Sequence, residues 1–313
     1  MTDTISSRRE IPQGAKIHFW NAPAGGQLRA FAWPSDSATP RGSILFQGGR
    51  GDIFEKYLEV FAHWHAQGWT ITWFDWRGQG GSGRLTPAAN CGHIESFDQY
   101  IADFRAFYAE WEAGTPEPHV VMGHSMGGHL VLRGLIEGAA TPDAAVLIAP
   151  MLGFKSALPF AERFAKILGG VGDSSRPAWK TNEKPYTSDS RYSLLTHDKG
   201  RYEDEIWWQH EKPEIVTGPP SWRWVIEAMK SMRELRDNPR LKRMNIPVLM
   251  LVAKADGLVD ARAALKIGPK LPDSRIVSFG NESAHEILRE VDAVRNRAIG
   301  EIDLFLAARA QKR

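Results

Sequence analysis

The chain has 313 residues, of which 42% are hydrophobic and 24% charged, and its formal net charge is only +2. These values are typical of a globular protein with a substantial core, and a near-neutral chain without a long basic run argues against nucleic-acid binding. The single cysteine, Cys91, excludes an internal disulfide, and no cysteine–histidine spacing is typical of a zinc site, so we expect no bound metal.

Residues 1–16 contain no apolar segment of the kind found in signal peptides. No stretch approaches the roughly 18 apolar residues that a transmembrane helix needs. The sequence therefore predicts a cytoplasmic protein without a transmembrane segment, and a peripheral contact with a membrane is compatible with it.

Apolar runs that read as strands alternate with helical patterns along the first half of the chain. The segments 16–22 and 27–34 predict a hairpin. Further strands are expected at 42–49, 69–76, 119–125 and 143–150, and helices at 54–67, 94–112 and 126–138. This alternation predicts a mostly parallel central sheet with helices on both faces.

The alternation stops near Pro150 and resumes with a strand at 246–256, a helix at 261–271, a strand at 274–280 and a helix at 285–310. The block between holds helical pieces and aromatic-rich loops. We therefore predict one α/β core, formed by residues 1–151 and 241–313, with residues 152–240 inserted as a helical cap.

The segment FDWRGQGGSG, residues 74–83, contains the pattern G-x-G-x-x-G. A dinucleotide-binding turn opens a helix, and an acidic residue follows about twenty positions later. Here the loop RLTPAANCG follows, and no such acidic residue closes a second strand. These glycines are therefore expected to shape a tight loop.

The segment GHSMGG, residues 123–128, lies between an expected strand and an expected helix. This context is typical of a nucleophile elbow, in which a serine occupies a strained turn and small residues stand two positions before and after it. Ser125 is the expected nucleophile, with Gly123 and Gly127 at the flanking positions.

A nucleophilic serine needs a base, and the base needs an acid that orients it. Asp256 ends one late strand and His285 follows the next, at the expected start of the last helix. The order Ser125, Asp256, His285 is that of α/β-hydrolases. Asp260 is the alternative acid, and we prefer Asp256 because it is closer to its strand end.

An oxyanion hole needs two backbone N–H groups. The first is expected from Met126, the residue after the nucleophile. The second is expected from the loop QGGRGD, where we prefer Gly49, with Gly48 and Arg50 as alternatives.

The segments FQGGRGD, FDWRGQGGSGR, GHSMGGH, KAD and AHEILRE resemble those of α/β-hydrolases of the monoacylglycerol lipase and lysophospholipase L2 type. The resemblance spans roughly residues 25–306, and LTHDKGRY and GPPSWRWVIEAM in the insertion resemble the lysophospholipase branch. Gln47 departs from the His-Gly that many lipases of the family carry at the oxyanion loop.

The resemblance implies a serine ester hydrolase that cleaves a lysophospholipid or monoacylglycerol through an acyl-enzyme on Ser125, without metal or organic cofactor. It also implies that apolar cap residues line an acyl tunnel. The candidates are Trp207, Trp208, Trp222 and Trp224, with Leu158, Phe160, Ile167 and Leu168.

Other functions are compatible with the same machinery: a general carboxylesterase, a thioesterase, a carbon–carbon bond hydrolase or an aminopeptidase. An aminopeptidase needs an acidic pocket for the substrate amine, which Glu203, Asp204 and Glu205 could supply. A non-catalytic binding protein on a hydrolase scaffold is disfavoured because serine, acid and histidine occur in the correct order.

Overall fold

The computed structural model describes residues 8–88, 90–155, 172–179 and 189–311. Within them an eight-stranded sheet has the order β1-β2-β4-β3-β5-β6-β7-β8. β2 pairs antiparallel with β1 and β4, and the other neighbours are parallel. The strands are β1 (Lys16–Asn21), β2 (Gln27–Trp33), β3 (Gly42–Gln47), β4 (Trp69–Phe74), β5 (His119–His124), β6 (Ala144–Ile148), β7 (Val248–Ala253) and β8 (Ser274–Phe279). The predicted mostly parallel sheet is confirmed.

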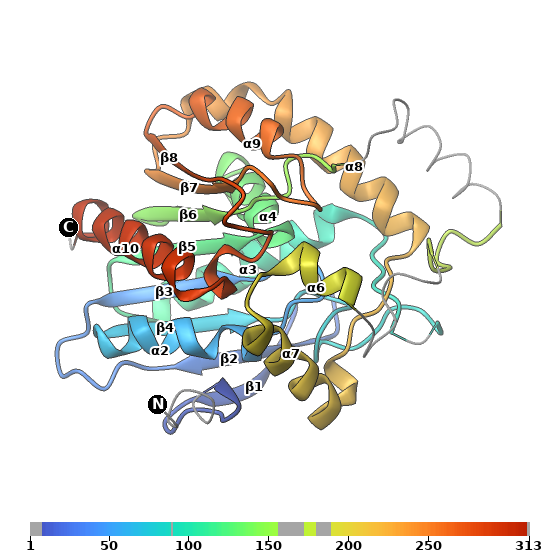
Figure 1. Cartoon of the computed structure of the whole chain (residues 1–313), viewed down its shortest axis with the longest axis horizontal. Coiled ribbons are helices and arrows are strands. Elements are labelled where there is room, and N and C mark those ends of the chain that lie inside the picture. The colour runs from blue at the N-terminus through green and yellow to red at the C-terminus, as the bar shows by residue number, and fades with distance from the viewer. Residues whose placement is uncertain (1–7, 89, 156–171, 180–188, 312–313) are drawn as a thin grey trace.

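Helices cover both faces of the sheet (Figure 1). The helices α2 (Leu58–Ala66) and α10 (Asp292–Arg309) pack on one hydrophobic cluster. The helices α3 (Phe97–Gly114), α4 (Met126–Ile136), α8 (Trp222–Arg236) and α9 (Ala261–Ile267) pack on the other. On β3, Ile44 and Phe46 belong to the first cluster and Leu45 to the second, because successive side chains of a strand point to opposite faces.

The chain between β6 and β7 contains α6 (Asp189–Leu195), α7 (Lys199–Glu211), the 3-10 turns Pro213–Ile215 and Pro239–Arg243, and α8. α8 contributes buried side chains to the same cluster as α3 and α4, so it covers a face of the sheet. α6 and α7 lie instead beside the loops at one edge, as Figure 1 shows. The boundaries of a cap at 152–240 stay a prediction.

Two helices differ from the sequence-based expectation. The segment expected as one helix at 54–67 is a 3-10 turn, Phe54–Tyr57, followed by α2. The helix expected at 285–310 is broken, because Glu290 and Val291 have extended backbones that separate the 3-10 turn Ile287–Arg289 from α10. His285 therefore lies in a loop, and its expected place at the start of the last helix is wrong.

The glycine turn after β4 does not open a helix, because the next one, α3, begins only at Phe97, where Ser96 caps it. Asp75 holds the turn by accepting the Gly81 N–H at 2.7 Å. This agrees with a structural loop.

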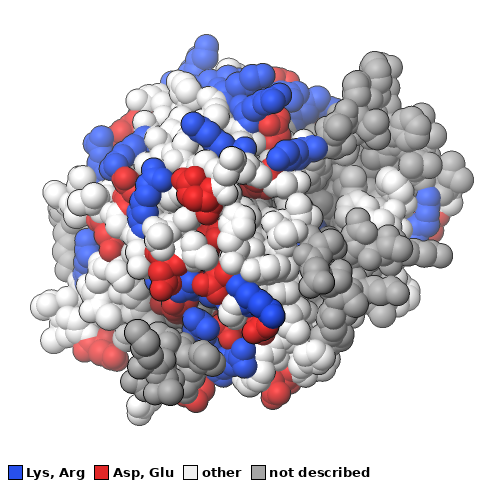
Figure 2. All heavy atoms as spheres, in the orientation of Figure 1, with Lys and Arg blue, Asp and Glu red and all other residues white. Residues whose placement is uncertain are grey.

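On the described part of the face in Figure 2, acidic and basic side chains are interspersed among uncharged ones, and Lys and Arg gather over α8 and α9. The expected absence of a nucleic-acid partner stays a prediction. No described helix is both long and apolar enough to cross a membrane.

Candidate active site

Ser125 stands between β5 and α4 with φ 52° and ψ −117°. A positive φ is strained for a residue with a side chain and persists only when the surroundings fix it. Here the Ser125 N–H donates to the Ile148 carbonyl and the Ser125 carbonyl accepts the Met151 N–H, both at 2.9 Å. The expected strand–turn–helix arrangement around the serine is present.

The glycines on either side of Ser125 are required by backbone contacts. A Cβ on Gly127 would lie 2.2 Å from the Gln47 carbonyl oxygen and 2.5 Å from that of Gly48. A Cβ on Gly123 would lie 2.6 Å from the carbonyl carbon and oxygen of Gly127. The elbow is thus packed tightly against the end of β3.

His285 and Asp256 are in direct contact. His285 Nδ1 lies 2.6 Å from Asp256 Oδ2, and both side chains are almost fully buried. Asp256 Oδ1 accepts the N–H groups of Leu258 at 2.7 Å and Val259 at 3.0 Å. The carboxylate is therefore fixed by its own loop, with one oxygen directed at the imidazole.

The environment shifts the pKa of both groups toward their charged forms. Burial alone would raise the pKa of Asp256, but the His285 ring and the two loop amides outweigh burial and hold this pKa below its usual value. Burial alone would lower the pKa of His285, but Asp256, Glu286 and Asp52 outweigh burial and raise it. A positive charge that develops on the imidazole is thus stabilised.

Asp260, the alternative acid, has a different contact. Its side chain caps α9 by accepting the Arg262 N–H at 2.9 Å. The structure therefore brings Asp256, and not Asp260, to His285.

His285 lies next to the elbow. Its ring centroid is 4.8 Å from that of His124, the residue that precedes Ser125. The loop after β3 reaches the same place, since a Cβ on Gly49 would lie 2.9 Å from Ser125 Cβ. Elements distant in sequence thus meet at the carboxyl ends of β3, β5, β7 and β8.

The oxyanion loop differs from the expectation in one respect. The Gly49 N–H donates to Asp52 Oδ2 at 2.7 Å, so in this arrangement its proton is directed at a carboxylate. Gly48 and Arg50 remain the alternatives for the second donor. The Met126 N–H is the first of α4, and the first amides of a helix have no acceptor within it.

Gln47, the last residue of β3, is fully buried. Neither its side-chain nitrogen nor its side-chain oxygen has a hydrogen-bond partner among the described residues. The side chain of Gln47 therefore makes no polar contact that would fix the oxyanion loop.

The four tryptophans proposed to contact substrate belong to two different clusters. Trp207 and Trp208 pack with the cluster of α2 and α10, where the Trp208 indole N–H donates to the Arg8 carbonyl at 3.0 Å. Trp222 and Trp224 pack with the cluster of α3 and α4, and Trp224 lies 5.5 Å from Phe97 between ring centroids. Their role in substrate binding stays a prediction. Leu158, Phe160, Ile167 and Leu168 lie outside the described residues.

Asp52 and Lys56 were not among the residues expected at the site, although Asp52 contacts Gly49 and His124 and pairs with Lys56. The signal available was an acidic and a basic residue four positions apart, directly after the glycines of the oxyanion loop.

Within the described ranges, no group of three or more histidine, cysteine, aspartate or glutamate side chains is arranged to hold a metal ion.

Residues 38–292 match the model of the Hydrolase_4 family, described as serine aminopeptidase, S33. The chain belongs to this family. Lysophospholipase L2 of Escherichia coli K12 is 27% identical to this hydrolase over 280 residues, which cover 84% of this chain and 79% of the relative. Monoglyceride lipase of Rattus norvegicus is 23% identical over 323 residues, covering 97% and 95%.

Solved structures resemble the hydrolase in fold. A soluble variant of monoglyceride lipase from Saccharomyces cerevisiae has a TM-score of 0.76 at 19% identity and covers 96% of this chain and 97% of its own. The monoacylglycerol lipase of Paleococcus ferrophilus has a TM-score of 0.69 at 20% identity, covering 90% and 98%. The α/β-hydrolase fold and the resemblance to this group are confirmed, and the chain is a serine hydrolase of the α/β family.

Proposed function

We propose that this hydrolase cleaves the ester of a single-chain lipid, a lysophospholipid or a monoacylglycerol, through an acyl-enzyme on Ser125. The observation that carries the proposal is the 2.6 Å contact between His285 and Asp256 beside the strained turn of Ser125. The similarity to lysophospholipase L2 and to monoglyceride lipase supports the substrate class.

In the first step the Ser125 hydroxyl attacks the ester carbonyl while His285 Nε2 takes its proton. Asp256 accepts a hydrogen bond from Nδ1, which selects the tautomer with Nε2 available as base, and it stabilises the imidazolium that forms. His285 then protonates the departing alcohol, which is glycerol from a monoacylglycerol or a glycerophosphate ester from a lysophospholipid.

The oxyanion would be held by the Met126 amide and by a second amide from the loop Gly48–Arg50. Backbone amides that are in place before charge develops stabilise an oxyanion strongly, and both of these donors are backbone amides. In the second step His285 activates water, which releases the fatty acid from Ser125.

The aminopeptidase alternative requires unpaired carboxylates that can hold a substrate amine. Asp204 contacts Arg8 at 2.5 Å and Arg9 at 2.7 Å, and Glu205 contacts Lys56 at 3.0 Å and Arg191 at 2.8 Å. The two carboxylates are thus neutralised by the protein's own cations. This arrangement disfavours an amine pocket at Asp204 and Glu205.

The proposal is tested with purified protein and a panel of 1-monoacylglycerols and lysophospholipids of about C8 to C18 acyl length, since ligand pockets are mostly apolar and chain length reports their extent. Short p-nitrophenyl esters and an alanyl anilide serve as comparison substrates, and Ser125→Ala is the blank. Fastest Ser125-dependent turnover on a long-chain lipid supports the proposal. Turnover confined to short activated esters, or to the anilide, rejects the lipid assignment.

A further inference from the structure

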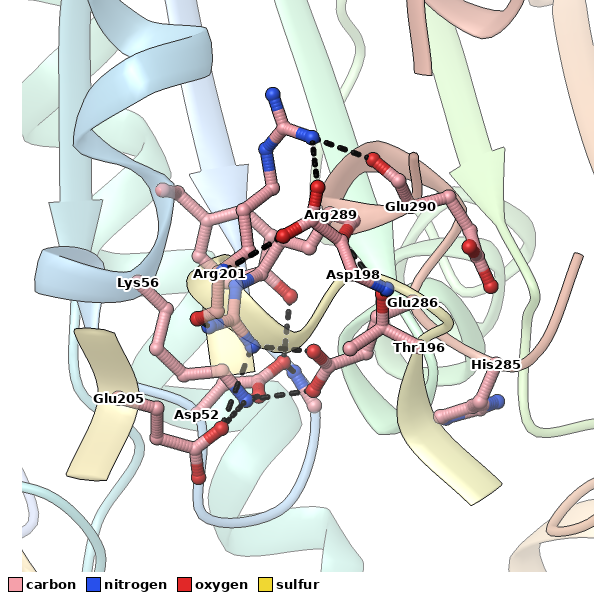
Figure 3. A network of polar contacts seen from close by, with 12 residues as sticks. Asp52, Lys56, Thr196, Asp198, Arg201, Glu205, His285, Glu286, Arg289 and Glu290 are labelled. Atoms are coloured by element: carbon pink, nitrogen blue, oxygen red, sulfur yellow. Dashed lines mark hydrogen bonds and ion pairs between the residues drawn. The ribbon is translucent and has the colours of Figure 1, made fainter. Parts of the chain in front are cut away.

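Lys56 is a buried cation shared by three carboxylates. Its Nζ lies 2.7 Å from Asp52 Oδ1, 2.7 Å from Glu286 Oε1 and 3.0 Å from Glu205 Oε2, and its side chain is 1% exposed. These carboxylates come from the oxyanion loop, from the position after His285 and from α7 of the insertion. Figure 3 shows them converging from separate elements.

Asp52 joins this cluster to the nucleophile side of the site. Its Oδ2 accepts the Gly49 N–H at 2.7 Å and the Tyr57 hydroxyl at 2.8 Å, and lies 2.8 Å from His124 Nδ1. Gly49 belongs to the oxyanion loop, and His124 directly precedes Ser125. One carboxylate therefore contacts both segments that must face the reacting carbonyl.

Glu286 joins the cluster to the base side. It directly follows His285, its second carboxylate oxygen pairs with Arg289, and its backbone N–H donates to the Leu195 carbonyl at 2.7 Å. The loop that carries His285 is thus held at one end by Lys56 and along its length by α6. Its position relative to Ser125 depends on this buried connection.

We propose that Asp52, Lys56 and Glu286 are positioning residues that set the oxyanion loop, the nucleophile elbow and the histidine loop relative to one another. The inference rests on the proposed Ser125–His285–Asp256 mechanism. A continuous series of contacts carries it. Asp52 contacts Gly49 and His124. Lys56 then pairs with both Asp52 and Glu286, which is the neighbour of His285.

The contacts that run from Asp52 through Lys56 to Glu286 are ionic at neutral pH. Burial would lower the pKa of Lys56, but Asp52, Glu205 and Glu286 outweigh it and raise this pKa. Burial would raise the pKa of Asp52, but Lys56 and His124 hold it well below its usual value. A buried ion pair adds little net stability compared with apolar packing, and its best-attested use is to fix one arrangement.

Four ionisable groups surround His285, so a change at Asp52 or Glu286 can be followed through the pKa of His285. They are Asp256 from the loop after β7, Asp52 from the loop after β3, His124 from the end of β5 and Glu286 from its own loop. Because the Asp52 and Glu286 charges raise the pKa of His285, removing either charge should lower it. This shift follows from the removed charge itself, so the loss of kcat and its non-additivity in the double variant decide the positioning role.

The test compares Asp52→Asn and Glu286→Gln, which keep side-chain shape and remove charge, with Asp103→Asn. Asp103 is a buried carboxylate on α3, and the Arg77 guanidinium holds both of its oxygens, at 2.6 and 2.7 Å. Each variant is assayed with a short p-nitrophenyl ester at a temperature where circular dichroism shows it folded. Labelling of Ser125 by a fluorophosphonate is followed in parallel.

We expect Asp52→Asn and Glu286→Gln each to lower kcat by roughly 10- to 100-fold with little change in KM, since misplacement of about 1 Å can cost 10²-fold. The acid limb of kcat/KM should move to lower pH in both variants, and the double variant should lose much less than the product of the single losses. Asp103→Asn should lower stability without these kinetic changes.

Losses of kcat no larger than those of Asp103→Asn would overturn the positioning role while wild-type labelling and turnover remain. If the fluorophosphonate does not label Ser125 of the wild-type protein and this protein hydrolyses no ester, the proposed function itself is rejected. Should Asp52→Asn not fold, Glu286→Gln decides alone, because in that variant Asp52 keeps its contacts with Gly49, Tyr57 and His124.

Discussion

His285 Nδ1 lies 2.6 Å from one oxygen of Asp256, while the other oxygen of that carboxylate accepts two amides of its own loop. The carboxylate therefore cannot rotate away from the imidazole without losing backbone hydrogen bonds. Two consecutive loops at the sheet edge, after β7 and after β8, are thus connected through one ionisable pair. The pair occupies Nδ1 of His285 and leaves Nε2 as the nitrogen that Asp256 does not contact.

Replacing Asp256 by asparagine should lower kcat by about 10⁴-fold, because the amide stabilises the wrong tautomer and no longer balances the imidazolium. Asp260→Asn is the matched control. It retains an oxygen for the α9 cap, so we expect nearly full activity and at most about 1 kcal/mol of lost stability. Steady-state kinetics and thermal denaturation of both variants check the ranking, and the reverse order would move the acid to Asp260.

Ser125→Ala should lower ester turnover by about 10⁵- to 10⁶-fold, the loss seen when a nucleophilic serine is removed from such a triad. The fold should persist, because alanine keeps the Cβ and the backbone hydrogen bonds to Ile148 and Met151 do not involve the hydroxyl. Burst kinetics and fluorophosphonate labelling measure the change. Substantial residual turnover on the same ester would remove Ser125 from the nucleophile's role.

The raised pKa of His285 predicts the acid limb of the pH profile. The base must be neutral, and Asp256, Glu286 and Asp52 favour the protonated imidazole despite its burial. As the pH falls through this raised pKa, kcat/KM should fall, so the midpoint should lie above about 6.5, the ordinary value for histidine. Measuring kcat/KM from about pH 5 to 9 on an ester without its own ionisation tests this. A midpoint below the ordinary value would mean that burial outweighs the carboxylates.

The sequence predicted those parts of the site that depend on chain order and local pattern. Gly123, Ser125 and Gly127 follow from the steric demands of a strand–turn–helix, and Asp256 and His285 from their place after two strands of a parallel sheet. The N-cap role of Asp260 has a local signature too, since the residue directly precedes an expected helix.

The sequence could not predict contacts that only tertiary packing creates. Lys56 and Glu286 are 230 positions apart, and nothing in either segment indicates that they meet. The direction of the Gly49 amide depends likewise on where the Asp52 side chain turns. The break at Glu290 depends on tertiary contacts too, since the Glu290 carboxylate accepts the N–H groups of Ala284 and His197.

The tight packing of the elbow predicts that a Gly→Ala substitution lowers stability there and raises it at an open position of a helix. A Cβ at Gly127 would meet two backbone carbonyl oxygens at 2.2 and 2.5 Å, and backbone cannot move aside as a flexible side chain can. Gly127→Ala should therefore lose about 1–3 kcal/mol or more of unfolding free energy and displace Ser125, with a large loss of kcat. Gly300 in α10 has no atom within 4 Å of its Cβ position, so Gly300→Ala should gain about 0.5–1 kcal/mol and leave activity unchanged. Urea denaturation and ester turnover of the two variants measure both effects, and equal stability would contradict the contact between the elbow and the end of β3.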